Sequence, residues 1–170
     1  GHFPAEDGVV HELPEKPKLA ALADMLDELG SGRQVIVWCV FRPEVELVSR
    51  WLEKNYGRVV NLHGGMSGPQ RDEAMAAFRA GDATYFVGTS SAGGTGINLQ
   101  VCANVAYYSR DFNFAVFSQS LDRVHRIGQY ESVSIVKLLA QNTIDEKVDK
   151  KLDMKGELMD MVLSDPEDML

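Results

Sequence analysis

Short apolar runs alternate with amphipathic stretches along most of the chain. The run at 34–40 (QVIVWCV) is continuous, apolar and rich in β-branched residues, which is typical of a strand buried on both faces of a parallel sheet. Shorter segments predict further strands at 58–62, 85–87, 104–108 and 133–139. In the intervening stretches, apolar residues recur at helical spacing. These stretches predict helices at 17–29, 43–55, 67–80, 113–124 and 144–163.

This alternation of strands and helices is typical of right-handed crossovers, which place parallel strands in one sheet with helices on both faces. The sequence therefore predicts an α/β domain with three layers (α/β/α) and five to six strands. We expect this domain to span residues 17–152, between an extended lead-in at 1–16 and an acidic helical tail at 153–170. Because the chain begins with Gly1 rather than Met, we interpret it as a fragment of a longer protein with a cloning scar at its front.

The loops that follow strands are the places to look for a ligand, because ligands of open parallel sheets bind beyond the carboxyl ends of the strands. The loops concerned are 41–42, 63–68, 89–99 and 109–113. The loop 89–99 (TSSAGGTGINL) combines three glycines with small hydroxyl residues, so its backbone N–H groups can approach phosphate oxygens closely. The chain contains no Gly-Lys-Ser/Thr, which excludes a Walker A loop, and Leu99 stands where a dinucleotide fingerprint needs its third glycine.

Two further segments carry groups that suit phosphate. Gly64 and Gly65 lie just before a predicted helix N-terminus, where exposed amides favour a nucleic-acid phosphate, although a tight strand-to-helix turn accounts for them equally well. Gln119, Arg123 and Arg126 are spaced by four and then three residues, which places them on one helix face. Two guanidinium groups and an amide on one face suit a bound polyphosphate, and a solvated helix face is the alternative.

Other kinds of site find little support in the sequence. The four histidines show no spacing typical of a metal site, and no pair of a nucleophile and a base can be recognised. Cys39 and Cys102 lie in apolar runs, so we expect two buried, reduced thiols rather than a disulfide or a metal pair. No apolar run reaches the roughly 18 residues of a membrane span, and the N-terminal stretch is not a signal peptide, so we expect neither a membrane protein nor a secreted one.

Taken together, these segments resemble the second, C-terminal RecA-like lobe of superfamily-two helicase-like ATPases, specifically the Swi/Snf-type translocases of double-stranded DNA. The resemblance runs from about residue 18 to about residue 151 and implies a RecA-like sheet. The segments VIVWCVFRPEVELVSRWL and LHGGMSGPQRDEAMAAF resemble the early strands, loops and helices of that lobe. The segment at 89–129, TSSAGGTGINLQVCANVAYYSRDFNFAVFSQSLDRVHRIGQ, carries most of the resemblance, because it is similar to motifs V and VI run together.

The resemblance also implies a division of work between two lobes of one polypeptide. The N-terminal lobe holds ATP and Mg²⁺, and the second lobe closes over them. Arg123 and Arg126 match the catalytic arginines of motif VI that reach the γ-phosphate, with Arg126 as the arginine finger. Gln119, Gly96 and Asn98 match positions near the nucleotide. The residues that match positions facing the DNA phosphates are Gly64, Gly65, Thr89, Ser90 and Ser91.

Two positions depart from the family pattern, since Ser91 stands where many members carry Arg, and Phe112 where Trp is usual. The resemblance implies an ATP hydrolase that moves along double-stranded DNA, in the nucleus of a eukaryote or in the cytoplasm of a bacterium. The alternatives are a degenerate, non-catalytic module that binds nucleic acid or protein, and a lobe of a strand-separating helicase. Because the phosphate-binding and Mg²⁺-binding motifs of a first lobe are missing, we expect no ATP hydrolysis by these residues alone.

The distribution of charge qualifies the expected contact with DNA. The 170 residues include 17 basic and 25 acidic side chains, and a net charge of −8 argues against nucleic-acid binding only if it is spread evenly. Residues 1–30 and 153–170 each carry −5, whereas residues 31–152 carry +2. We therefore expect most of the electrostatic affinity for DNA to come from the first lobe or from flanking regions, and tight duplex binding by this chain alone at physiological salt would contradict that.

Overall fold

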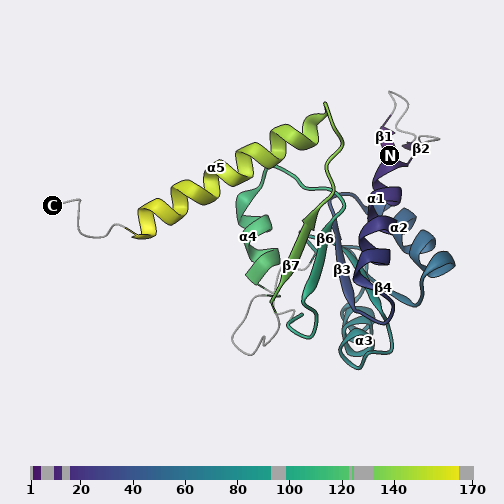
Figure 1. Ribbon diagram of the computed structural model, residues 1–170. Helices are drawn as coiled ribbons and strands as arrows, with labels where there is room; N and C mark the ends of the chain where they lie inside the picture. The colour runs from purple at the N-terminus through teal and green to yellow at the C-terminus, as the bar shows by residue number, and fades with distance from the viewer. Residues whose placement is uncertain are drawn as a thin grey trace.

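A five-stranded parallel sheet forms the centre of the molecule (Figure 1). The computed structural model describes residues 2–4, 10–12, 16–92, 99–122, 124 and 132–164, with side chains described between 16 and 157. The strands lie in the order β4 (Val59–Leu62), β5 (Tyr85–Thr89), β3 (Val35–Cys39), β6 (Asn104–Tyr107) and β7 (Ser134–Lys137). All four pairings between neighbours are parallel, which confirms the predicted sheet.

Helices cover both faces of this sheet. On one face lie α1 (Pro17–Leu29) and α2 (Arg42–Asn55), and on the other lie α3 (Gly68–Arg79) and α4 (Phe114–Asp122). The fifth helix, α5 (Ile144–Ser164), follows β7 and extends away from the sheet (Figure 1). The predicted helices and strands are thus confirmed, with every boundary within two residues of the observed one.

The two ends of the chain add features that the sequence did not indicate. Near the N-terminus, β1 (His2–Pro4) and β2 (Val10–Glu12) pair antiparallel. Neither segment has a periodic pattern, so their pairing could not be predicted from either one alone. Near the C-terminus, α5 continues without a break across positions 152 and 153, where we expected the lobe to pass into its tail.

The central strand β3 is the best-buried element of the fold. All five of its side chains are buried, and the register places Trp38 between Gly88 of β5 and Tyr107 of β6. The absence of a side chain at Gly88 matters, because an added Cβ would lie 2.9 Å from the carbonyl oxygen of Leu62 on β4. The two cysteines, Cys39 at the end of β3 and Cys102 just before β6, are buried and free, as predicted.

A buried arginine joins the end of β6 to α4 and α5. The side chain of Arg110 is 5% exposed, forms an ion pair with Asp149 of α5, and lies 5.4 Å from the centre of the Phe117 ring on α4. Lys137 of β7 bonds to Asp149 at 3.0 Å and to Asp153 at 2.8 Å. Burial lowers the pKa of Arg110, and the nearby charge of Asp153 acts in the opposite direction. The position of α5 therefore depends on carboxylates that compensate two cations.

We expect Asp149→Asn to lower the free energy of unfolding by about 2–3 kcal/mol, because it removes the carboxylate from a buried guanidinium. Asp153→Asn is the matched control. Its carboxylate is 50% exposed and hydrogen-bonds only to Lys137 among the described residues, while its charge acts on Arg110 without a hydrogen bond, so we expect a smaller loss, within about 1 kcal/mol. Urea denaturation of the two variants measures both values. Equal effects would show that the pairing with Arg110 does not stabilise the fold.

Candidate functional site

The loops expected to bind a ligand all leave the sheet at the carboxyl ends of its strands. Since β4, β5, β3 and β6 are parallel neighbours, the loops after them follow one another along the carboxyl ends of the strands. The loop after β4 is next to the loop after β5, so the structure groups the residues expected to face DNA. These residues are Gly64, Gly65, Thr89, Ser90 and Ser91.

The loop after β4 is a tight turn into α3. The N–H of Gly65 donates to Nδ1 of His63 at 3.2 Å, and the N–H of Met66 donates to the His63 carbonyl at 3.1 Å. Arg71 of α3 reaches back and donates from Nη2 to the carbonyl of Gly64 at 3.4 Å. Both glycines are exposed. These hydrogen bonds stabilise the turn without any ligand. Its exposed backbone also allows a phosphate to approach closely.

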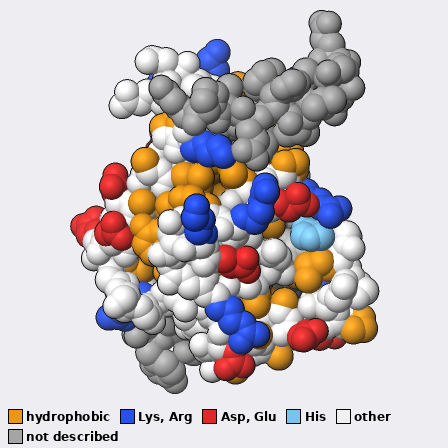
Figure 2. All heavy atoms as spheres, turned by 90° about the vertical axis from the view of Figure 1, so that its right-hand side faces the viewer, with side chains coloured by type: hydrophobic (Ala, Val, Ile, Leu, Met, Phe, Trp, Pro, Cys, Tyr) orange, Lys and Arg blue, Asp and Glu red, His pale blue; other side chains and the backbone are white. Residues whose placement is uncertain are grey.

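Arg42 lies beside this turn, and the sequence analysis gave it no role. It is the first residue of α2, and its Nη1 lies 3.3 Å from the place that a Cβ on Gly65 would occupy. Its side chain is 62% exposed and pairs through Nε with Glu46 at 3.0 Å, one helical turn along α2. An exposed pair of this kind contributes little stability, and among the described residues the other four guanidinium N–H donors have no hydrogen-bond partner. Figure 2 shows this side of the molecule, where Lys and Arg side chains are scattered among acidic, hydrophobic and uncharged groups.

The loop after β5 begins with a structural turn. Thr89 is 7% exposed, and its hydroxyl accepts from the N–H of Ala92 at 3.3 Å. The N–H of Ser90 donates to the carbonyl of Cys39 at 3.1 Å, which extends the contact between β5 and β3. Ser91 is exposed. Among these three residues, Ser91 is thus the one whose side chain is open to a ligand without rearrangement, and the DNA contacts of all three stay predictions.

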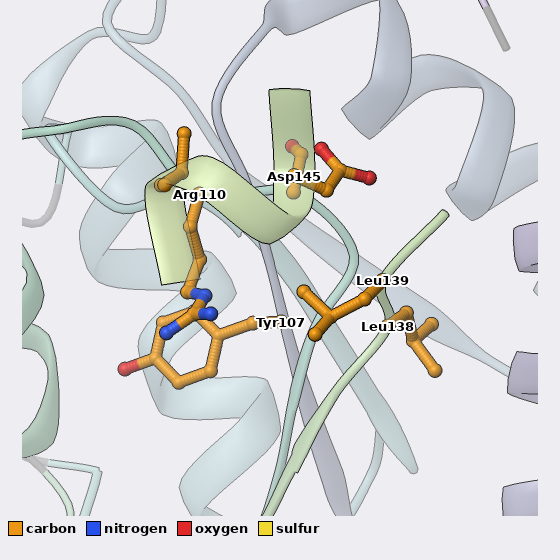
Figure 3. Close-up of a pocket in the computed structure, with 7 residues that line it drawn as sticks. Tyr107, Arg110, Leu138, Leu139 and Asp145 are labelled. Atoms are coloured by element: carbon orange, nitrogen blue, oxygen red, sulfur yellow. The ribbon is translucent and has the colours of Figure 1, made fainter. Parts of the chain in front are cut away.

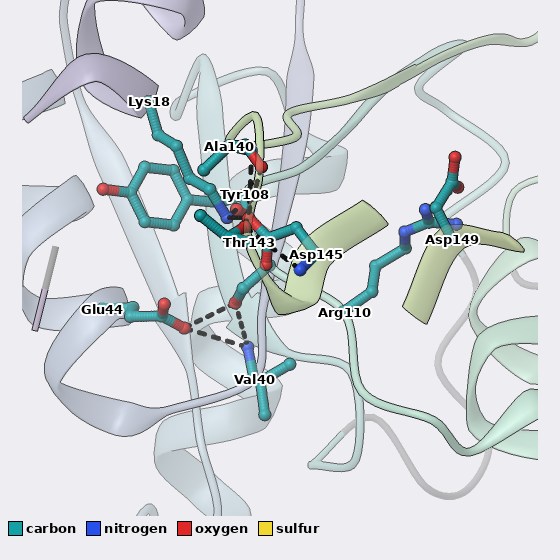
Figure 4. Close-up of polar contacts among 10 residues, drawn as sticks. Lys18, Val40, Glu44, Tyr108, Arg110, Ala140, Thr143, Asp145 and Asp149 are labelled. Carbon is teal, nitrogen blue, oxygen red and sulfur yellow. Dashed lines mark hydrogen bonds and ion pairs between the residues drawn. The ribbon is translucent and has the colours of Figure 1, made fainter. Parts of the chain in front are cut away.

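The loops after β3 and β6 are fixed to each other through Glu44 (Figure 4). The Ser109 hydroxyl donates to Glu44 at 2.5 Å and accepts from the N–H of Val40 at 2.8 Å. The same carboxylate oxygen accepts from the N–H of Phe41 at 3.1 Å. Burial, and then the charge of Glu44, raise the pKa of the Cys39 thiol, which keeps it protonated. The start of α2, which carries Arg42, therefore has a rigid support.

A second set of contacts joins the starts of α1 and α5 at the same edge. Lys18 donates to the carbonyl of Tyr108 at 2.9 Å and pairs with Asp145 at 2.5 Å (Figure 4). Asp145 also accepts from the N–H of Ala140 at 3.1 Å. Burial, followed by the charge of Glu44, raises the pKa of Tyr108. Helices that begin far apart in the sequence are thus tied to one loop.

Two cavities formed by described residues at the carboxyl ends of the strands do not suit a nucleotide. The small cavity in Figure 3, lined by Tyr107, Arg110, Leu138 and Asp145 among others, has a volume of about 10 Å³, which is at most the space of one water molecule. A larger basin of about 490 Å³ is mainly apolar, with Phe41 and several neighbours in its wall. Its charged groups Lys18, Glu44, Arg110, Asp111 and Asp145 are all bonded within the chain. Neither of these two cavities is therefore a closed, charged pocket for ATP.

The helix α4 comes just before the two predicted motif VI arginines in the sequence. Ser120 faces inward, where its hydroxyl donates to the Phe117 carbonyl and lies 2.6 Å from the Tyr107 hydroxyl, while Gln119 is exposed. Arg123 and Arg126, together with Gly96 and Asn98, lie outside the described residues, so their predicted roles stay predictions. Within the described part of the chain, no group of three or more His, Cys, Asp or Glu could hold a metal ion. None of its helices is long and apolar enough to cross a membrane.

Residues 17–128 match the family described as helicase conserved C-terminal domain. The chromatin-remodelling ATPase INO80 of Emericella nidulans is 32% identical over 154 residues, which cover 89% of this chain and 10% of the relative. A putative ATP-dependent helicase/translocase of Bacillus subtilis, YwqA, is 36% identical over 148 residues, covering 86% of this chain and 16% of the relative. The chain therefore spans only a small part of the length of these relatives.

A solved structure gives the same result for the fold. The crystal structure of the C-terminal part of the Fun30 ATPase domain superposes with a TM-score of 0.73 at 26% identity, covering 81% of this chain and 46% of that one. The strand order, the family match and these relatives agree with one another. The chain belongs to the helicase conserved C-terminal domain family, as the second RecA-like lobe of a Swi/Snf-type, superfamily-two helicase-like ATPase.

Proposed function

We propose that this chain is the second motor lobe of an ATP-dependent translocase of double-stranded DNA. The main support for this proposal is the surface formed by the turns at 63–67 and 89–92, at the carboxyl ends of β4 and β5. Exposed backbone lies there beside Arg42. Backbone N–H groups and a guanidinium hold phosphates without reading bases, as movement along any sequence requires. Relatives named as a chromatin-remodelling ATPase and a helicase/translocase support this assignment.

In such a reaction ATP, bound with Mg²⁺, supplies the phosphoryl group. The residues of this chain would contact the bound nucleotide from one side only. We infer that Arg126 acts as the arginine finger, with Arg123 and Gln119 beside it and with Gly96 and Asn98 near the nucleotide. The sequence has no Walker A lysine, and the described residues contain no candidate metal cluster. The first lobe of the same polypeptide would therefore hold most of the phosphates and the metal.

The two parts of the proposed ATP site lie on different lobes, and this couples hydrolysis to movement of the lobes. A guanidinium that reaches the transferring phosphoryl group stabilises its negative charge and accelerates hydrolysis by roughly 10³–10⁵, or about 4–7 kcal/mol of barrier. Because Arg126 reaches the nucleotide only when the lobes close, hydrolysis is coupled to movement of one lobe relative to the other. The turns proposed to contact DNA belong to the same lobe as Arg126, so they move together with it. The protein would act where the DNA lies, in the nucleus or in the bacterial cytoplasm.

A binding module without catalysis and a lobe of a strand-separating helicase are the alternatives. The presence of Gln119, Arg123 and Arg126 at motif VI spacing favours a catalytic lobe over a binding module. A helicase would use the same residues, so only an assay of strand separation distinguishes it from a translocase that leaves the duplex intact.

We expect the isolated 170-residue chain to fold and yet to hydrolyse no ATP, with or without duplex DNA, because one side of the nucleotide site is missing. Circular dichroism with cooperative urea unfolding checks the fold, and release of inorganic phosphate checks the activity. The protein with both lobes, assayed in parallel, should hydrolyse ATP faster with DNA. Robust turnover by the isolated chain would contradict the proposal.

We expect Arg42→Gln in the protein with both lobes to weaken duplex binding about three- to tenfold and to reduce the salt slope by about one charge. The matched control is Arg79→Gln, which removes the same charge from the last turn of α3. Binding is measured by fluorescence anisotropy across a salt series. If the two variants behave alike, Arg42 has no specific contact with the DNA backbone.

A further inference from the structure

The strand β4 is one end of the sheet, and the described residues place no strand on its outer side. The Arg58 carbonyl accepts from the N–H of Tyr85 at 3.1 Å, and backbone groups alternate in direction along a strand. The N–H and C=O groups of Val60 therefore face β5, whereas those of Val59 and Asn61 face outward. This edge presents up to four hydrogen-bonding groups in the spacing of a β-ladder.

A groove of about 470 Å³ runs between this edge and α3. Its apolar floor consists of Val60 and Met66 from the β4 side and of Ala74 and Ala77 from α3. Because both helix positions are alanine, the helix surface stays low and leaves Val60 partly exposed in the middle of a strand. The groove thus has room for one aliphatic side chain beside the open backbone edge.

Two opposite charges border the groove without partners. Arg58 and Glu73 line it, both are exposed, and neither forms an ion pair or hydrogen bond within the described part of the chain. The polar side chains between them are already engaged: Asn61 accepts from the Ser49 hydroxyl at 2.5 Å, and Gln70 accepts from the N–H of Ser67 at 2.9 Å. The unused charges are therefore the ones that an incoming segment would meet.

The two edges of the sheet differ in how they are protected. At the β7 edge, Lys137 is bound to Asp149 and Asp153 of α5, which places a charged network beside the strand. The β4 edge (VVNL) contains no lysine, proline or glycine, and its four pairs with β5 are regular. Natural sheets commonly use such residues or bulges to prevent pairing at an edge, so the β4 edge is open to another strand.

We propose that the β4 edge and the groove beside α3 bind an extended peptide segment of a protein partner. The segment adds a sixth strand by bonding to the backbone of Val59 and Asn61, places a small aliphatic side chain over Val60, and meets Arg58 with an acidic side chain. Main-chain bonding of this kind suits peptide and not nucleic acid, because the groove has an apolar floor and carries the carboxylate of Glu73. This site does not depend on the proposed use of ATP. It shares the turn at 63–67 with the proposed DNA contact, because His63, Gly65 and Met66 also line the groove.

The test begins with selection of random decapeptides, displayed on phage, against the full 170-residue chain. We expect enriched peptides to share an acidic residue close to an aliphatic one. A synthetic copy of the most enriched peptide, titrated into isotopically labelled protein, should shift the amide resonances of Val59 and Asn61. Failure to enrich any peptide, or shifts confined to another surface, would overturn the proposal.

Two matched pairs of variants locate the bound peptide. Asn61→Pro removes an outward N–H, whereas Asn61→Ala keeps it and loses the same bond to Ser49, so only the proline should weaken peptide binding, by about five- to tenfold. Ala77→Leu fills the groove and should weaken binding at least about tenfold, whereas Ala76→Leu on the exposed side of α3 should not.

The second pair keeps the test decisive if the proline variant does not fold, since Ala77 lies outside the strand. Equal binding by the Ala77→Leu and Ala76→Leu variants would overturn the proposal. Light scattering of the chain without peptide gives a further outcome. A dimer that Ala77→Leu dissociates would show that a second copy occupies the edge, which would also overturn it.

Discussion

The arrangement of the functional loops depends on the burial of β3 on both faces. Its five side chains are inaccessible to solvent, and it pairs in regular register with β5 and β6. Large and small residues fit together around it: the Trp38 ring packs edge-on against Phe86, and Gly88 leaves no room for a Cβ beside Leu62. A shift of one residue would move each side chain of the strand to the opposite face of the sheet, where the other set of helices packs. Because its neighbours are parallel to it, the same register determines where the loops after β4, β5 and β6 emerge.

The polar contacts at the carboxyl ends of the strands extend this order into the loops. Glu44 and Ser109 hold the backbone after β3, and Arg71 holds the turn after β4. Arg42 then lies beside Gly65 on a support that is already rigid. A site for a passing DNA backbone needs such a support, because groups that are held in place lose little conformational entropy when phosphate binds. The proposed nucleotide site differs, since most of its predicted residues lie outside the described part of the chain.

The sequence predicted the fold well because the pattern that specifies it is local. A run such as QVIVWCV indicates a strand with two buried faces, and the helices between such runs show their own spacing. The contacts that it missed join distant residues: Arg110 and Asp149 are 39 positions apart, and no local pattern marks either of them. The sequence placed Arg42 in a loop expected to face a ligand, but its proposed contact with DNA depends on its position beside Gly65 of another loop, which no local pattern shows. The roles of Arg123 and Arg126 were predicted from family resemblance, and they stay predictions because both residues lie outside the described part of the chain.

We infer above all that this lobe completes an ATP site on another lobe by means of Arg126. The most direct test is Arg126→Ala in the protein with both lobes, with ATP binding and DNA-stimulated hydrolysis measured on the same preparation. We expect the rate of ATP hydrolysis to fall by about 10³-fold or more, while the affinity for ATP changes little. Hydrolysis that persists in this variant at the rate of the unmodified protein would contradict it.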